Sequence, residues 1–198
     1  MWRRLDREAP ADLLHALLLR YTESHRHYHD RRHLVDCLQK SATCREIQRR
    51  PTEVDLALCY HDAIYDPGRG DNEERSAALA AGVLEPLLSR KRVERIRASI
   101  LDTRHEGEPA AADGAVVVDV DLSILGADPE RYEDYRRAIR EEYSWVPESS
   151  YRRRRSRLLR SFLDRSRIFA TPLFQERLES RARENLAREL AFLEGSDG

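Results

Sequence analysis

Residues 56–66 read LALCYHDAIYD, an apolar stretch with helical spacing that contains an adjacent histidine and aspartate, His61-Asp62. We expect a helix here that runs to the stop signal in residues 66–68. On such a helix His61 and Asp62 would point about 100° apart, so their spacing alone does not place both on one ion. An aspartate among apolar neighbours is costly without a partner, and a cation, a helix cap or an arginine could each supply one.

Helical periodicity continues along nearly the whole chain, without an internal repeat or a low-complexity linker. Three consecutive valines, Val116 to Val118, favour a strand by β-branching. One isolated strand would have no partner, so the helical context favours a helix there too. The segment 106–114, rich in Gly, Pro and Ala, indicates a surface loop. We therefore predict an all-α fold, with helices over residues 13–21, 30–48, 52–66, 72–88, 92–103, 128–143, 151–169 and 172–195.

Several helix starts carry residues that cap or initiate helices. Asp30 is expected to be an N-cap, and Asp128-Pro129 and Thr171-Pro172 each place a proline at the first helical position. Thr52, with Asp55 three residues later, predicts a capping box.

Length and charge point to one ordinary globular domain. The chain has 198 residues, which is long enough to bury a sizeable core. We expect residues 1–198 to form a single compact helical domain, with a metal-site core at about 21–126 and C-terminal helices at about 128–195. Thirty-five basic residues nearly cancel thirty-six acidic ones, so net charge argues neither for nor against a nucleic-acid partner.

The cysteines and the apolar runs predict a cytoplasmic protein. Cys37, Cys44 and Cys59 form no CxxC pair, which fits a reducing compartment where each thiol acts as a small apolar side chain. The most apolar early run, residues 13–19, is too short to span a bilayer, and no cleavage site follows it. We expect neither a signal peptide nor a membrane partner.

The strongest basic cluster is YRRRRSR at residues 151–157. Consecutive positions point all round a helix, so only some of these arginines could meet one nucleic-acid backbone. A solvated, salt-bridged face is the favoured interpretation, and nucleic acid is not expected as a partner. Tyr132, Tyr135 and Tyr143 lie at helical spacing, which favours a place in the core over a base-stacking surface.

Residue types that bind divalent cations recur on separate segments of the chain. His29 and His33 are four residues apart and would share one face of a helix, about 40° apart. A polar helix surface explains that pair equally well on its own. Ligand-type residues on four segments are less expected by chance than any one pair. The other segments hold His61-Asp62, His105, and Asp119 with Asp121.

These residues stand in motifs that resemble the HD superfamily of metal-dependent phosphohydrolases. The strings are HRHYH (25–29), HDAIYD (61–66), NEERSA (72–77) and DVDLSILG (119–126). More narrowly, they are similar to a bacterial group of predicted metal-dependent HD phosphohydrolases, and the similarity continues through residues 139–143 and 182–186. The resemblance implies one helical HD domain with a helical C-terminal extension.

The resemblance also implies a ligand set. Carried over position by position, the residues that bind the first metal are His33, His61, Asp62 and Asp121. Asp121 fits the Asp-Leu-Ser form of the motif, while a slip of two residues to Asp119 stays open.

Three further residues receive roles from the same motifs. His29 corresponds to the histidine that protonates the leaving oxygen in phosphodiesterase relatives. His105 falls where many HD proteins place a histidine near a second metal, and a solvated histidine at a helix end is the alternative. Glu73 is expected to accept a hydrogen bond from a ligand histidine or from a metal-bound water. The alternative is that it is simply an acidic residue in the first turn of a helix, where negative charge is favourable.

The resemblance implies hydrolysis of a small phosphorylated compound, such as a nucleotide, by metal-activated water, with Asp62 and His29 as catalytic residues. One or two ions of Mn²⁺, Fe²⁺, Co²⁺, Zn²⁺ or Mg²⁺ suit the mixed ligands. Two alternatives stay open: a non-catalytic, metal-stabilised nucleotide-binding or regulatory module, and a di-iron oxygenase of the HD fold. The apolar surface of the final helix is compatible with an oligomer.

Overall fold

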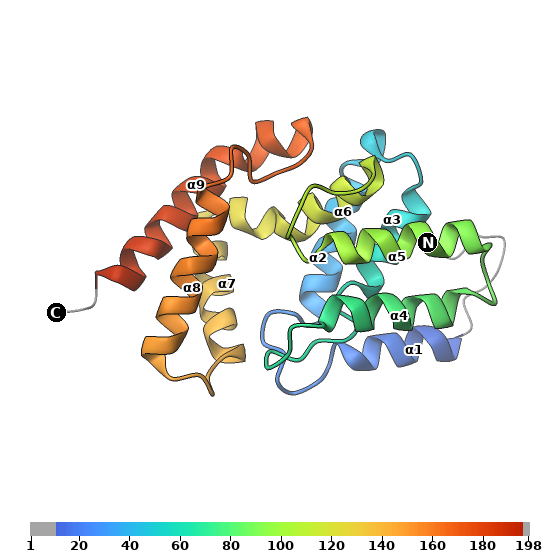
Figure 1. Cartoon of the computed structure of the whole chain (residues 1–198), viewed down its shortest axis with the longest axis horizontal. Helices are drawn as coiled ribbons and strands as arrows, with labels where there is room; N and C mark the ends of the chain where they lie inside the picture. Colours follow the sequence, from blue (N-terminus) through green and yellow to red (C-terminus); the bar gives the residue numbers. More distant parts are fainter. Residues whose placement is uncertain (1–10, 196–198) are drawn as a thin grey trace. The chain divides into compact units, whose positions relative to one another are not determined.

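The structure is a computed structural model that describes residues 11–195 (Figure 1). Over these residues the chain forms nine α-helices and no strand, which confirms the predicted all-α fold class. None of the described helices is both long and apolar enough to cross a bilayer. The helices are α1 (Ala11–Arg20), α2 (Arg31–Ala42), α3 (Pro51–Tyr60), α4 (Asn72–Leu84), α5 (Arg90–Asp102), α6 (Ala112–Asp121), α7 (Pro129–Glu142), α8 (Glu148–Leu163) and α9 (Pro172–Glu194), with 3₁₀ turns η2 (Arg45–Ile47) and η3 (Leu122–Gly126).

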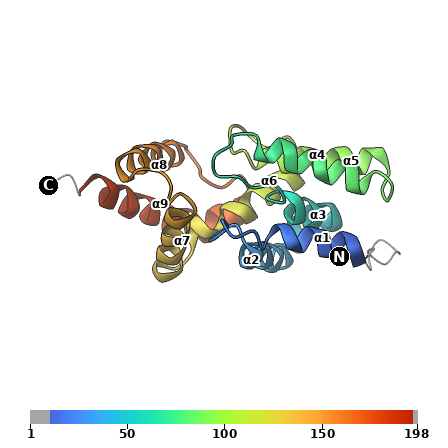
Figure 2. The same cartoon turned by 90° about the horizontal axis from the view of Figure 1, so that it is seen from below.

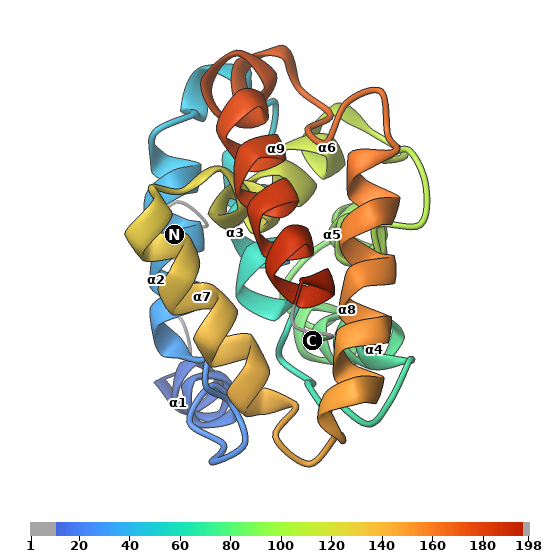
Figure 3. The same cartoon turned by 90° about the vertical axis from the view of Figure 1, so that its left-hand side faces the viewer.

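The described chain divides into two compact units, with the boundary after Asp121. The first unit contains α1 to α6, where α3 packs against α2, α5 and α6, and α4 lies beside α5 (Figure 2). The second contains η3 and α7 to α9, where α9 packs against η3 and α8 (Figure 3). All of the predicted site residues belong to the first unit. That the whole chain is one domain stays a prediction.

Two short helices of the first unit are almost fully buried. Every residue of α3 from Glu53 to Tyr60 is buried, as expected for a helix with apolar residues all round. In α6 the residues 116–120 are buried as well. The three valines therefore lie in a helix, as predicted, because packing against α2, α3 and α5 outweighs their β-branching.

The helix α3 ends at Tyr60, well before the predicted stop. His61 is its C-cap, and the chain then turns, with the Ala63 amide bonded to the Tyr60 carbonyl at 3.0 Å. The carbonyls of Asp62 and Ala63 accept hydrogen bonds from the buried Arg26 side chain, at 2.7 and 3.4 Å. These bonds replace those of a continuing helix. The pair His61-Asp62 thus lies at a helix end, where a 100° separation on a helix does not apply.

The predicted capping box at the start of α3 is wrong. The N-cap is Arg50, and Pro51 takes the first helical position, so Thr52 already lies inside the helix. Asp55 is buried and accepts a hydrogen bond from the Ser41 hydroxyl at 2.8 Å. The spacing of Thr52 and Asp55 does not produce a capping box because the Asp55 carboxylate bonds Ser41 of another segment.

Other predicted boundaries differ from the structure by up to one or two turns. The helix α2 ends at Ala42 and α4 at Leu84, two residues before Pro86. The predicted loop 106–114 already contains the start of α6. The helix α8 begins and ends earlier than predicted. These segments form helices as predicted, but where each helix ends depends on contacts with residues that are distant in the sequence.

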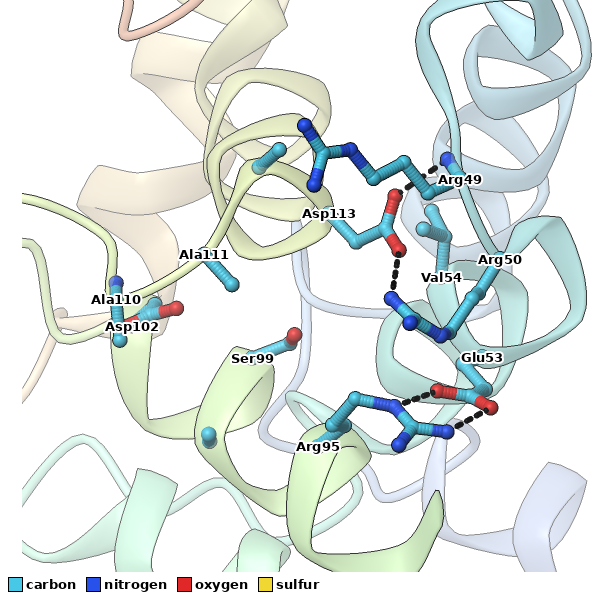
Figure 4. Close-up of a pocket in the computed structure, with 12 residues that line it drawn as sticks. Arg49, Arg50, Glu53, Val54, Arg95, Ser99, Asp102, Ala110, Ala111 and Asp113 are labelled. Carbon is cyan, nitrogen blue, oxygen red and sulfur yellow. Dashed lines mark hydrogen bonds and ion pairs between the residues drawn. The ribbon is translucent and has the colours of Figure 1, made fainter. Parts of the chain in front are cut away.

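Hydrogen bonds and ion pairs hold the starts of α3 and α6 (Figure 4). Glu53, in the first turn of α3, accepts two hydrogen bonds from Arg95 of α5, at 2.7 and 2.8 Å. Asp113, at the start of α6, accepts a hydrogen bond from the backbone amide of Arg49 at 2.8 Å and lies 3.7 Å from the Arg50 guanidinium. A cavity of about 90 Å³ lies among these side chains. Both helices are therefore fixed at the ends opposite the predicted metal ligands.

A buried ion pair joins α8 and α9 in the second unit. Arg155 Nε lies 2.8 Å from Glu189 Oε1, and the two side chains are only 7% and 1% exposed. The Tyr132 hydroxyl donates to Glu189 at 2.5 Å, and the Tyr135 hydroxyl accepts from Arg155 at 3.2 Å. The basic run is therefore not wholly a solvated face. Tyr132 and Tyr135 are buried as predicted, whereas Tyr143 is only half-buried.

Gly126 lies at the close approach of η3 to α9. A Cβ there would lie 2.6 Å from Leu178 Cβ and 2.9 Å from the Leu178 carbonyl oxygen. We expect Gly126→Ala to lower the free energy of unfolding by about 1–3 kcal/mol, because the α9 backbone must move. Gly82→Ala is the control: its added Cβ meets nothing within 4 Å, and alanine should stabilise α4 by up to about 1 kcal/mol. Urea denaturation measures both, and an unchanged stability of Gly126→Ala would contradict the close approach.

Candidate metal centre

Four predicted metal ligands meet at one point in the first unit. The Nε2 atoms of His33 and His61 are 3.1 Å apart. Asp62 Oδ2 lies 3.4 Å from His33 Nε2 and 3.0 Å from His61 Nε2. Asp121 Oδ1 lies 3.4 Å from each of these two nitrogens. The four side chains come from α2, from the end of α3 and from the end of α6.

Such separations match ligand atoms that share one cation. With metal–ligand distances of about 2.1 Å, neighbouring ligands lie about 3.0 Å apart in octahedral and about 3.4 Å apart in tetrahedral coordination. Two imidazole nitrogens and two carboxylate oxygens also form a donor set suited to a divalent transition-metal ion. The geometry and the donor types agree, so the cluster could hold a metal ion.

Local structure fixes the two histidines. Asp30 is the N-cap of α2, as predicted, and its side chain accepts hydrogen bonds from the amides of Arg32 and His33. The Nδ1 of His61 lies 2.8 Å from the Leu58 carbonyl oxygen. Because a carbonyl only accepts, Nδ1 carries the proton of that bond, and Nε2 faces the cluster.

Opposite charges in the cluster shift its pKa values strongly. Burial alone would lower the pKa of His61, but the charges of Asp62 and Asp121 outweigh it and raise that pKa well above its ordinary value. Burial alone would raise the pKa of Asp62, but His61 and His29 hold it well below its ordinary value. A metal-free cluster therefore keeps protons on its imidazoles beside ionised carboxylates.

Asp62 supplies a further sign that the residues fit a cation. Its Oδ2 is buried and makes no hydrogen bond of good geometry to any described residue, although two ring nitrogens lie close to it. Buried carboxylate oxygens are normally satisfied by a donor or a metal ion. A cation held by the cluster would satisfy this oxygen.

His29 lies next to the cluster, as its predicted role requires. Its ring stacks on Tyr65 with a centroid distance of 4.1 Å, and its centroid lies 5.6 Å from that of His33. The side chain is half-buried, so a ligand arriving from solvent could reach it. The charge of His29 also contributes to the low pKa of Asp62.

Arg26 holds two site segments together, a role that no sequence pattern indicated. Its guanidinium donates to the His29 carbonyl at 3.0 Å and to the Asp62 carbonyl at 2.7 Å, and its Nε donates to Glu23 at 2.9 Å. The residue is only 6% exposed, so water cannot readily replace these bonds. Arg26 therefore fixes the backbone on both sides of the cluster.

Loss of these bonds should weaken metal binding. We expect Arg26→Met to lower cation affinity by about 10- to 100-fold, the range for partners that orient metal ligands. Competition with a chromophoric chelator measures the affinity. Arg31→Met, at an exposed position of α2, is the matched control and should bind as wild type does. Equal affinities of the two variants would contradict the role of Arg26.

His105 contacts Asp121, one of the predicted ligands. Its Nε2 lies 3.1 Å from Asp121 Oδ2, the carboxylate oxygen other than the one that faces the cluster histidines. Its backbone has a φ of 57°, in the left-handed region that non-glycine residues rarely adopt. The side chain is 18% exposed, so His105 is not a solvated histidine at a helix end.

Glu73 lies in the first turn of α4, close enough to Asp62 and His105 for their charges to act on its carboxyl group. Burial raises the pKa of its carboxyl group, and the nearby charge of Asp62 adds to that rise. The Leu58 carbonyl, and not Glu73, holds the Nδ1 of His61. Glu73 therefore does not hold the Nδ1 of His61, and its other predicted roles stay predictions.

Cys37 is a cluster member that the sequence pattern did not indicate. Ligand atoms of His33, Cys37, His61 and Asp121 all lie within 4.8 Å of one another. Cys37 follows His33 by four residues on α2 and so shares its face. That four-residue spacing is the one sequence signal that points to Cys37, and the predicted apolar role of the thiol does not use it.

Comparisons with models of protein families, with curated proteins and with solved structures found no match to this chain.

Cation binding should depend on pH, because the cluster must release protons first. A raised histidine pKa means that the folded, metal-free protein keeps imidazole protons above the ordinary pKa of about 6.5. The stability that these protons contribute is complete below the unfolded pKa and is lost as pH rises through the folded pKa. We expect cation affinity to rise with pH and the metal-free protein to lose stability over that alkaline range.

Titration calorimetry in two buffers with different ionisation enthalpies measures the number of protons released on cation binding. Thermal unfolding across the same pH range measures the loss of stability and its recovery on adding cation. Binding that releases no protons and is independent of pH would contradict the protonation state described for the cluster.

Proposed function

We propose that this protein is a metal-dependent phosphohydrolase of the HD superfamily that acts on a small phosphorylated compound, such as a nucleotide. The observation that carries the proposal is the convergence of His33, His61, Asp62 and Asp121, with recorded separations of 3.0–3.4 Å between their ligand atoms. The order of these residues and the strings around them, which resemble that superfamily, support it.

The two histidines and two carboxylates would hold the cation. When bound, a divalent cation supplies activation of water and offsets negative charge on phosphoryl oxygens. His105 restrains the Asp121 carboxylate through its second oxygen, while the Leu58 carbonyl restrains His61. Both contacts keep ligand atoms aimed at one point, so little reorganisation is needed on binding.

His29 is proposed as the general acid. A protonated imidazole can donate a proton to the oxygen of a departing group, which would otherwise leave as a costly alkoxide. Stacking on Tyr65 fixes the plane of the ring, and the bond from Arg26 to the His29 carbonyl fixes its backbone.

The test begins with full-length protein whose metal content is measured. Phosphomonoesters, cyclic dinucleotides and nucleoside triphosphates are then screened with added Mn²⁺, Co²⁺, Zn²⁺ or Mg²⁺. Metal-stimulated turnover that is lost in Asp62→Ala supports the proposal. Turnover no higher than that of Asp62→Ala on every substrate contradicts it.

His29→Ala separates hydrolysis from binding. We expect its turnover to fall by about 10²- to 10⁴-fold, the usual contribution of a positioned acid, while cation affinity stays near that of wild type. His15→Ala, at an exposed position of α1, is the control. Nucleotide binding without turnover in wild type would favour a binding or regulatory module. Bound iron with oxygen consumption would favour a di-iron oxygenase.

A further inference from the structure

The arginines of α8 divide into two groups by their partners. One group forms ion pairs with glutamates: Arg152 with Glu148, Arg155 with Glu189 and Arg160 with Glu194. The other group, Arg153, Arg154 and Arg157, is exposed, and no carboxylate among residues 11–195 pairs with it. Arg153 donates to the Ser150 hydroxyl at 3.1 Å. Three guanidiniums of one helix are therefore available to a partner from outside.

These three arginines lie on one side of α8. At about 100° per residue, Arg153, Arg154 and Arg157 fall within a sector of about 100° and within about one and a half turns. We call this surface the arginine face. Ser161, also exposed, lies one turn after Arg157 in the same sector. The carboxylate nearest to this sector along the helix is that of Asp164, the C-cap, two turns beyond Arg157.

The charge of the arginine face fits a partner with closely spaced negative groups. Exposed ion pairs between single side chains contribute little, so an isolated carboxylate is a weak partner. A nucleic acid instead presents a row of phosphates, about one every 1.7 Å along a duplex, and arginines that bind several of them release condensed counterions. A guanidinium also matches phosphate oxygens with two parallel hydrogen bonds. Hydroxyl groups such as that of Ser161 are further donors to phosphate.

An anionic membrane fits the arginine face less well. A helix that lies on a bilayer inserts a broad apolar face between the lipids. The large apolar side chains of α8 are mostly buried in the protein, with Tyr151, Leu159 and Phe162 among them. Leu158, at the edge of the arginine face, is the exposed large apolar side chain in the described helix α8, at 46%. One leucine does not make an apolar face.

We propose that the arginine face binds the phosphodiester backbone of a nucleic acid. Contacts to phosphates carry no sequence information, so binding should be independent of base sequence. The sequence alone favours a solvated, salt-bridged face for residues 151–157, and the three unpaired guanidiniums are the structural reason to assign a partner instead. The proposal concerns the second unit of the chain and does not depend on the proposed phosphohydrolase function.

The salt dependence of oligonucleotide binding tests the proposal. Full-length protein is mixed with a labelled single strand or duplex, with a chelator present to prevent metal-dependent hydrolysis, and fluorescence anisotropy is recorded. Three phosphate contacts predict that log affinity falls with log salt with a slope of about −2 for a single strand and about −2.7 for a duplex. Replacing Arg153, Arg154 and Arg157 together with glutamine should remove most of this slope and weaken binding at least about tenfold at low salt.

The matched control removes the same charge at exposed arginines that are already paired. These are Arg97, Arg137 and Arg181, which pair with Glu94, Asp134 and Asp128. Their triple glutamine variant should keep the slope of wild type. Glutamine is a good helix former, and circular dichroism checks that both variants fold. Should the arginine-face variant not fold, Arg157→Gln alone decides, with an expected loss of about 0.7 in the single-strand slope.

Three results would overturn the proposal. The first is equal affinity and slope for the two triple variants. The second is no binding of either oligonucleotide by wild type at low salt. The third is binding to phosphatidylserine vesicles or to polyglutamate without binding to oligonucleotides, which would assign the arginine face to a lipid or protein partner.

Discussion

Replacing Asp62 with asparagine should remove metal-stimulated turnover and lower cation affinity. The loss of affinity should exceed about 10- to 100-fold, which is the typical effect of removing a residue that only hydrogen-bonds a metal ligand. Asparagine keeps the shape of the side chain but not its charge, so it cannot offset the charge of a dication. The same change removes a negative charge from beside His61, which lowers the pKa of that histidine towards its ordinary range. Chelator competition and metal analysis measure the first effect.

The control for this variant is Asp134→Asn. Asp134 is exposed on α7 and pairs with Arg137 at the surface, at 2.5 Å. Surface ion pairs contribute little, so stability should change by no more than about 1 kcal/mol, and cation affinity should not change. If Asp62→Asn bound cation as tightly as Asp134→Asn, the proposed ligand set would be wrong.

Replacing Glu189 with alanine should lower the free energy of unfolding by about 3–5 kcal/mol, the largest effect on stability that we expect. The change leaves the Arg155 guanidinium charged and buried without its carboxylate. Arg155 cannot escape by losing its proton, because a guanidinium is effectively always protonated in proteins even without a carboxylate beside it. The Tyr132 hydroxyl also loses its acceptor.

Glu194→Ala is the matched control on the same helix. Glu194 pairs with Arg160 at 2.6 Å, but the two side chains are 44% and 57% exposed. Water replaces such a partner, so this change should cost about 0–1 kcal/mol. Urea denaturation of both variants measures the difference. Equal losses of stability would show that the Arg155–Glu189 pair is not buried as described.

The all-α fold class can be predicted from the spacing of apolar residues, because each helix buries one face and so repeats apolar residues every three to four positions. The valines 116–118 show the limit of residue preference, since packing keeps them in α6 despite their β-branching. Helix ends were less predictable. The end of α3 depends on Arg26, which lies far from it in sequence and bonds the carbonyls of Asp62 and Ala63.

In the candidate site, too, local motifs predict some residues, whereas others depend on contacts between distant segments. Their order and motifs predict His33, His61, Asp62 and Asp121 as ligands, and the structure brings all four together. The motifs do not predict Cys37, because its neighbours His61 and Asp121 lie on other segments of the chain. The local pattern favours a solvated face for Arg155 for the same reason: its partner Glu189 lies on another helix.

An anomalous-scattering map of wild-type crystals grown with Zn²⁺ or Co²⁺ tests whether the four side chains hold one metal ion. We expect a metal peak about 2.0–2.3 Å from His33 Nε2, His61 Nε2 and carboxylate oxygens of Asp62 and Asp121. A map with no peak among these four side chains, in crystals that contain the ion at saturating concentration, would contradict it.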